Sequence, residues 1–191
     1  MGMFRVNMVR ALAVAVAMSA GLVIASESRA APAAPAAPAR YGGPIGRTQV
    51  MIRGLDWLRR DIAYSQDNRR ARWDLNRGRR YRPDCSGFVS MAWALDPRRA
   101  GLGRALVTWE LPSVSTRVRW DRLRRGDILL HLNPANRATE HVQLFAGWVD
   151  AGRTRAWVLE QSSRARGMRR RAVVLAAARR DYLPYRYRHI V

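Results

Sequence analysis

The order of the apolar segments limits which folds this chain can adopt. From Trp120 to the C-terminus, short apolar segments alternate with turn residues, a pattern typical of β-strands. The expected strands cover residues 126–132, 141–149, 155–162 and 171–176, with a further strand in the tail. The segments before residue 100 have helical spacing instead. Helices followed by strands predict an α+β domain, with N-terminal helices packed on an antiparallel β-sheet.

Two helices are expected in the N-terminal part of the domain. The first covers about residues 47–63, where four apolar residues recur at helical spacing: Met51, Leu55, Leu58 and Ile62. The second covers residues 84–95, with Asp84 as its N-cap and Pro83 at its entrance. Residues 65–83 are polar and irregular, which predicts a loop.

Residues 1–30 have the features of a signal peptide. Arg5 and Arg10 precede a 15-residue apolar run, and Ala25 and Ala30 both fit the small-residue rule for cleavage. This run is short for a membrane span, which needs about 20 residues, so a cleaved signal peptide is favoured. An uncleaved membrane anchor is the alternative interpretation. Cleavage predicts an exported protein with no stable membrane span in its mature form.

The rest of the chain divides into a linker and one domain. Residues 31–47 begin with alternating alanine and proline, which favours an extended spacer over a packed core. Residues 48–191 remain for the domain, a length that is sufficient for one hydrophobic core.

The net charge predicts attraction to polyanions. The formal charge is +21, and all 35 basic residues are arginine. Wall polymers, lipid headgroups and nucleic acid would each attract such a charge. Specific nucleic-acid binding is not expected, because four of the tryptophans that might stack on bases lie in apolar contexts: Trp57, Trp93, Trp148 and Trp157. An arginine cluster at residues 164–171 is interpreted as a solvated basic surface.

Cys85 is the only cysteine, which excludes an intramolecular disulfide. In the first turn of the expected helix, free N–H groups and the positive end of the helix dipole favour a thiolate. Cys85 is therefore a candidate nucleophile, and the alternatives are an intermolecular link and a small buried apolar residue. The sequence has no HExxH, phosphate-binding loop or CxxC motif, so neither a metal nor a cofactor is expected. It carries no signal for the oligomeric state.

Three histidines are candidates for a general base. His141 opens a strong strand after a polar loop, so its ring can face a cleft, and it is the best candidate. His131 lies inside an apolar run, where a structural hydrogen bond is the favoured role. His189 is two residues from the C-terminus and is expected to be peripheral.

The expected hairpin over residues 141–162 supplies a partner for His141. If its turn is centred between Asp150 and Ala151, His141 lies opposite Glu160, and opposed side chains are ~5 Å apart. A carboxylate there would hold the imidazole tautomer and stabilise the imidazolium. A shift of one residue would present Gln161 instead, and the residue count does not decide between them.

These residues lie in four motifs whose order resembles the NlpC family of cell-wall cysteine peptidases. The motifs are DCSGFVSMAW, LRRGDILLH, HVQLFAGWVD and VLEQSS. The resemblance covers about residues 48–190 and implies a papain-like core. It also implies a secreted, wall-associated enzyme that cleaves peptidoglycan stem peptides, typically between D-γ-glutamate and a diamino acid.

The resemblance also implies the roles of three residues in catalysis. The family nucleophile corresponds to Cys85, and the family base corresponds to His141. The third polar residue lies on the next strand, where the family usually has histidine and this chain has Glu160.

Further positions correspond to substrate contacts in the family. Tyr64 matches a tyrosine that precedes the nucleophile helix. Asp84 and Ser86 match residues that bind the free amine of an L-alanine end. The glycines that usually follow the tyrosine are replaced here by SQDNRRARWDL, which changes the expected cleft wall. Asp127 is interpreted as structural.

Two other functions remain open at this point. A catalytically weak wall-binding module of the same fold would also account for the basic charge. The same cysteine and histidine would also serve a thiol amidase or acyltransferase acting on another substrate.

Overall fold

The computed structural model describes residues 40–98 and 103–191. The predicted signal peptide at 1–30 and residues 31–39 of the linker lie outside the described residues. In the part of the chain that is described, no helix is long and apolar enough to cross a membrane.

The first helix, α1 (Arg47–Arg59), ends four residues before its predicted end. It buries Val50, Met51 and Trp57. Leu55 was predicted to lie on this face but is 41% exposed, because the buried stripe runs one position earlier. Gly54 lets α1 pack closely on the sheet, since a Cβ at this position would lie 3.0 Å from Leu144.

Two further helices flank the sheet. The second, α2 (Cys85–Ala92), begins one residue after Asp84 as predicted, and ends three residues early. All eight of its residues are buried. The third, α3 (Leu175–Asp181), was not predicted, because the expected strand at 171–176 included its first two residues.

Six antiparallel strands form the main sheet in the order β3-β8-β4-β5-β6-β7. Their bounds are β3 (Ser115–Arg117), β4 (Ile128–His131), β5 (His141–Trp148), β6 (Arg155–Ser162), β7 (Gly167–Val174) and β8 (Leu183–Tyr187). The predicted α+β class with an antiparallel sheet is confirmed. Strand β3 was not predicted, and β7 starts four residues before its predicted start.

The segment predicted as a loop contains a small second sheet. Strands β1 (Arg72–Trp73) and β2 (Arg80–Tyr81) pair there after a short 3-10 helix, η1 (Asn68–Arg70). Asp74 holds the turn between the two strands by accepting the N–H of Gly78 at 2.9 Å.

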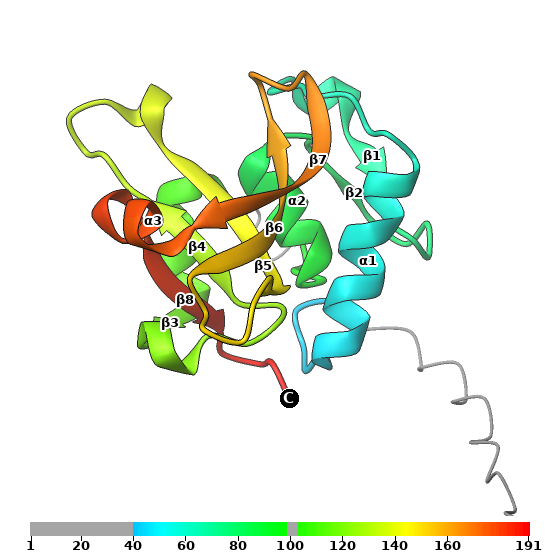
Figure 1. Ribbon diagram of the computed structural model, residues 1–191. Helices are drawn as coiled ribbons and strands as arrows, with labels where there is room; N and C mark the ends of the chain where they lie inside the picture. Colours follow the sequence, from blue (N-terminus) through cyan, green and yellow to red (C-terminus); the bar gives the residue numbers. More distant parts are fainter. Residues whose placement is uncertain (1–39, 99–102) are drawn as a thin grey trace, which may run out of the picture. The chain divides into compact units, whose positions relative to one another are not determined.

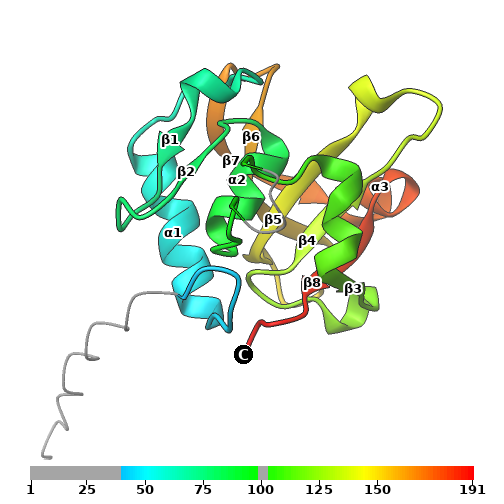
Figure 2. The same cartoon turned by 180° about the vertical axis from the view of Figure 1, so that it is seen from behind.

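Apolar side chains cover both faces of the main sheet. The larger cluster joins α1 and α2 to residues such as Leu144 and Leu159 of the sheet. The smaller cluster lies on the other face and includes Phe145 and Val158. Helix α2 lies behind the sheet in Figure 1 and in front of it in Figure 2. The start of α2 and the start of β5 can therefore meet at one end of the sheet.

Candidate active site

The start of α2 fixes the position of Cys85. Oδ1 of Asp84 caps the helix by accepting the N–H of Gly87 at 2.8 Å. Residue 87 must be glycine, because a Cβ there would lie 1.9 Å from the carbonyl oxygen of Arg82. Cys85 is thus the first residue of α2. Its N–H has no intrahelical acceptor, and the positive end of the helix dipole lies nearest to it.

Cys85 is almost enclosed by its neighbours. The residue is 8% exposed, and its Sγ lies 3.6 Å from Oγ1 of Thr108. Thr108 is the first residue of a 3-10 helix, η3 (Thr108–Val114), that packs against α2. The thiol is also a neighbour of the His141 imidazole, because Cys85 is among the groups that raise the pKa of that ring. The structure therefore brings together the predicted nucleophile and the predicted base.

His141 lies between Cys85 and Glu160. Its Nε2 is 2.8 Å from Oε2 of Glu160. An ionised carboxylate only accepts hydrogen bonds, so Nε2 carries a proton and Nδ1 is left for the thiol. Burial lowers the pKa of His141, but hydrogen bonds to Cys85 and Glu160 outweigh burial and raise the pKa to about 9. The geometry thus favours an imidazolium beside the cysteine at neutral pH.

The contact between His141 and Glu160 arises from a different strand register than predicted. Near the turn, Trp148 pairs with Ala156, which is a shift of three residues from the predicted pairing. A β-bulge between Phe145 and Gly147 reduces the shift to two, so Leu144 pairs with Leu159. A shift of two residues leaves every side chain on its original face, so Glu160 still meets His141, diagonally rather than directly.

Gln161, the alternative partner of His141, points away from it. Its Nε2 donates to the carbonyl oxygen of Ile62 at 2.8 Å. Successive residues of a strand alternate between faces, so Gln161 faces the loop after α1 while Glu160 faces His141. The structure thus brings Glu160, rather than Gln161, to the imidazole.

Glu160 accepts hydrogen bonds from four side chains. Oε2 accepts from Gln143 at 2.9 Å as well as from His141. Oε1 accepts from Nε of both Arg169 and Arg171, the latter at 2.8 Å. Burial would raise the pKa of Glu160, but these partners hold it well below its usual range. The carboxylate is therefore ionised and fixed in place.

The sequence interpretation missed Arg169 and Arg171. It placed both in a solvated cluster, but β7 carries them beside Glu160, with Arg169 directly opposite it in the ladder. The missed signal is the alternation within GMRRRAVV, where residues 169 and 171 share one face and Arg170 lies on the other. Thr108 was also missed, because nothing in its sequence context links it to Cys85.

The three predicted substrate contacts lie close to the cysteine. Asp84 and Ser86 are buried and belong to one network, in which Arg82 Nε donates to Oδ2 of Asp84 at 2.6 Å. Tyr64 is half-buried. Burial and the charges of Cys85 and Asp84 raise the pKa of Tyr64 to about 12, so its hydroxyl stays protonated.

The other predicted histidines and Asp127 have structural contacts. Nδ1 of His131 lies 2.7 Å from the carbonyl oxygen of Asp181. His131 is paired with His141 in the β4–β5 ladder, but its side chain makes this structural contact. His189 contacts the carbonyl oxygen of Gly42. Asp127 is fully buried and accepts hydrogen bonds from arginine side chains and from the N–H of residue 124.

The predicted core tryptophans divide into two pairs. Trp57 and Trp93 are fully buried, as predicted. Trp148 and Trp157 are half-buried instead, and each lies under an arginine guanidinium.

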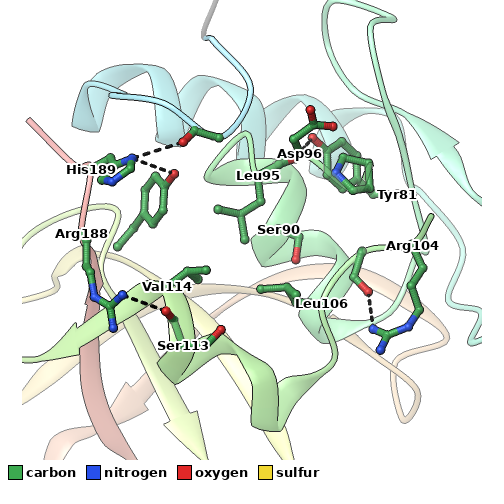
Figure 3. Close-up of a pocket in the computed structure, with 14 residues that line it drawn as sticks. Tyr81, Ser90, Leu95, Asp96, Arg104, Leu106, Ser113, Val114, Arg188 and His189 are labelled. Carbon is green, nitrogen blue, oxygen red and sulfur yellow. Dashed lines mark hydrogen bonds between the residues drawn. The ribbon is translucent and has the colours of Figure 1, made fainter. Parts of the chain in front are cut away.

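A separate cavity of about 300 Å³ lies between the second half of α2 and the C-terminal residues. Figure 3 shows Ser90, Leu106 and Val114 among its lining residues. Cys85, His141 and Glu160 are not among the residues that line it. The cavity is therefore distinct from the cysteine site. Within residues 40–98 and 103–191, no group of three or more histidine, cysteine or acidic residues is placed to hold a metal ion.

The sequence matches no protein-family profile and no curated protein. The solved structures that are similar in part include Ly7917 with the hydrolysing product of MDP, at 18% identity and a TM-score of 0.40, and Ly7917, at 15% identity and a TM-score of 0.44. The similarity covers 54% and 70% of this chain, and 52% and 60% of those chains. Similarity this low does not identify a shared fold or function.

Proposed function

We propose that this protein is a cysteine peptidase in which Cys85 is the nucleophile, His141 the general acid and base, and Glu160 the residue that orients His141. The observation that carries the proposal is the placement of one imidazole between a helix-terminal thiol and a buried carboxylate. Thiol catalysis requires a thiolate, a base and a group that orients the base, and these three residues supply them.

The reaction begins with the Cys85 thiolate paired to the His141 imidazolium. Sγ attacks the carbonyl carbon of the scissile amide, and the N–H of Cys85 stabilises the oxyanion at the start of α2. His141 gives its proton to the leaving amine, and the C–N bond breaks to leave a thioester. Neutral His141 then takes a proton from water as the oxygen attacks the thioester, and Cys85 leaves as thiolate with release of the carboxylic acid.

The proposed substrate is a peptidoglycan stem peptide cut at the bond between D-γ-glutamate and a diamino acid. The motifs of the sequence support this substrate through their resemblance to the NlpC-type cell-wall peptidases with a papain-like core. Asp84 and Ser86 are the proposed contacts of its free amine end, and Tyr64 is a further proposed substrate contact. All three lie close to Cys85, and the Tyr64 hydroxyl stays protonated at neutral pH.

The proposed site of action is outside the cytoplasm, at the cell wall. The export features of residues 1–30 support this location, and the formal charge of +21 favours anionic wall polymers as the surface that the protein meets. No cofactor and no specific nucleic acid is part of the proposal.

Digestion of purified cell wall tests the proposal. Wild-type protein should release peptide fragments whose masses identify the bond cut, and Cys85→Ser should release none while still binding wall in a salt-sensitive manner. His141→Gln should also be inactive, whereas the matched control His189→Gln should retain activity, because His189 is hydrogen-bonded to Gly42 and not to Cys85.

The alternatives give different results in the same experiment. A wall-binding module would bind the wall without releasing fragments, and its Cys85 would react with an alkylating agent no faster than a free thiol. In an acyltransferase, a supplied amine would attack the thioester in place of water, and the product would be an amide of that amine. Fragments released by Cys85→Ser would contradict the nucleophile assignment.

A further inference from the structure

The buried carboxylate of Glu160 is surrounded by more positive charge than it can balance. Arg169 and Arg171 both bind its Oε1, and His141 binds its Oε2. Neither arginine has a second acidic partner in the part of the chain that the structure describes. The two guanidinium charges alone therefore exceed the single carboxylate charge that both of them contact.

Both arginines also have hydrogen-bond donors that are not used. A guanidinium has five N–H groups, and in each case only the Nε group bonds to Glu160. The terminal nitrogens of Arg169 and Arg171 have no acceptor among the described residues. Each side chain is 39% exposed, so these nitrogens are accessible to a ligand. Paired guanidinium donors fit the two oxygens of a carboxylate.

The position of the arginines indicates which half of the substrate they meet. The contacts run in order from Cys85 to His141, then to Glu160, then to the arginines. In the proposed mechanism, Cys85 bonds to the acyl half and His141 protonates the amine of the leaving half. Groups beyond His141 therefore lie nearer the leaving half.

We propose that Arg169 and Arg171 form a subsite for a carboxylate on the leaving half of the substrate. The subsite selects a diamino acid whose side chain ends in a second, free carboxylate, such as diaminopimelate, over its amide or over lysine. This inference rests on the proposed peptidase function.

Hydrolysis of three matched peptides tests the selection. They differ only in the leaving diamino acid, which is diaminopimelate with its far carboxyl free, the same residue with that carboxyl amidated, or lysine. Loss of a charge-assisted hydrogen bond is worth about tenfold or more, so wild-type kcat/KM should favour the free acid over the amide by at least that factor. The difference should lie mainly in KM.

Substitutions in β7 separate recognition from the positioning of Glu160. Arg169→Gln and Arg171→Gln should each reduce the preference for the acid over the amide. Arg170→Gln is the matched control, because it removes the same charge from the same strand, while its guanidinium lies 4.1 Å over the Trp157 ring on the other face. It should leave the preference intact. If Arg169→Gln and Arg171→Gln lower kcat equally for acid and amide, the arginines only position Glu160 and the subsite is refuted.

Binding to Cys85→Ala protein keeps the inference testable when no peptide is cleaved. Calorimetric titration with the acid and amide peptides should show tighter binding of the acid, and Arg171→Gln in the same background should abolish the difference. Equal binding of acid and amide overturns the subsite. Failure of wild-type protein to cleave any of the peptides counts against the peptidase function instead.

Discussion

Replacing Glu160 with glutamine tests the electrostatic basis of the site. Glutamine keeps the size and one accepting oxygen, but it removes the negative charge 2.8 Å from Nε2 of His141. Arg169 and Arg171 then lose the charge that balances them and repel the imidazolium. Both changes favour the neutral imidazole.

The expected size of the effect follows from the pKa of His141. That pKa rises from 6.5 to about 9, which corresponds to about 3 kcal/mol in favour of the imidazolium. An opposite charge at hydrogen-bond range accounts for about 1 to 3 pKa units. In Glu160→Gln we therefore expect the pKa of His141 to fall to about 6 to 8.

Titration of the imidazole resonances by NMR measures this pKa directly. The chain has three histidines, so His131→Gln and His189→Gln variants suffice to assign the signal of His141. Asp121→Asn is the control, because it removes a carboxylate from an exposed pair with Arg119 and should leave the midpoint unchanged. A wild-type midpoint near 6.5, or one that Glu160→Gln does not move, would refute the reasoning.

Three further predictions concern stability and the thiol. The folded-state pKa of Glu160 lies below its unfolded value of 4.5, so the ionised carboxylate stabilises the fold above that pH and less as the pH falls below it. Glu160→Gln should therefore lower the free energy of unfolding more at about pH 7 than at about pH 3, which denaturant titrations at the two pH values measure. Gly87→Ala should lower the free energy of unfolding by about 1–3 kcal/mol and slow the alkylation of Cys85, because the new Cβ would meet the Arg82 carbonyl. The control Gly46→Ala should change neither quantity, because no atom lies within 4 Å of its new Cβ. Thr108→Val should slow alkylation of Cys85 by up to about tenfold, and Thr108→Ser should restore the rate; equal rates in all three proteins would exclude a role for the hydroxyl.

Local signals in the sequence were enough to predict the ends of several elements. Asp84 caps α2 through a bond that spans three residues, and glycine at 87 is required by a contact with the nearby Arg82 carbonyl. The start of β5 and the bounds of β6 also follow from apolar runs bounded by turn residues. Contacts between residues that are only a few positions apart can be predicted from the local sequence pattern.

The contact between His141 and Glu160 was predicted from an incorrect register. The strands are offset by three residues next to the turn, and a β-bulge between Phe145 and Gly147 makes the offset two residues at the start of β5. Because side chains alternate with a period of two, this error moved Glu160 along the correct face instead of reversing it. An error of one residue would have brought Gln161 to His141.

Interactions across several elements left no signal that could be read locally. Arg169 meets Glu160 only because β7 starts at Gly167 and pairs along β6, whereas the predicted strand began at residue 171. Thr108 reaches Cys85 through the packing of η3 on α2. Both contacts depend on the assembled fold, so propensity and spacing did not indicate them.

The position of β7 at the edge of the sheet has a consequence for how the candidate site would come apart. This strand pairs along β6, and on its outer side the described residues add one bridge, from Ala63 to Gly167. Strands at a margin open more readily than internal ones. Detachment of β7 would remove both guanidinium groups from Glu160 together, while the pairing of the other five strands stays intact. Reactivity of the thiol should therefore decline before global unfolding and report on the opening of this one strand.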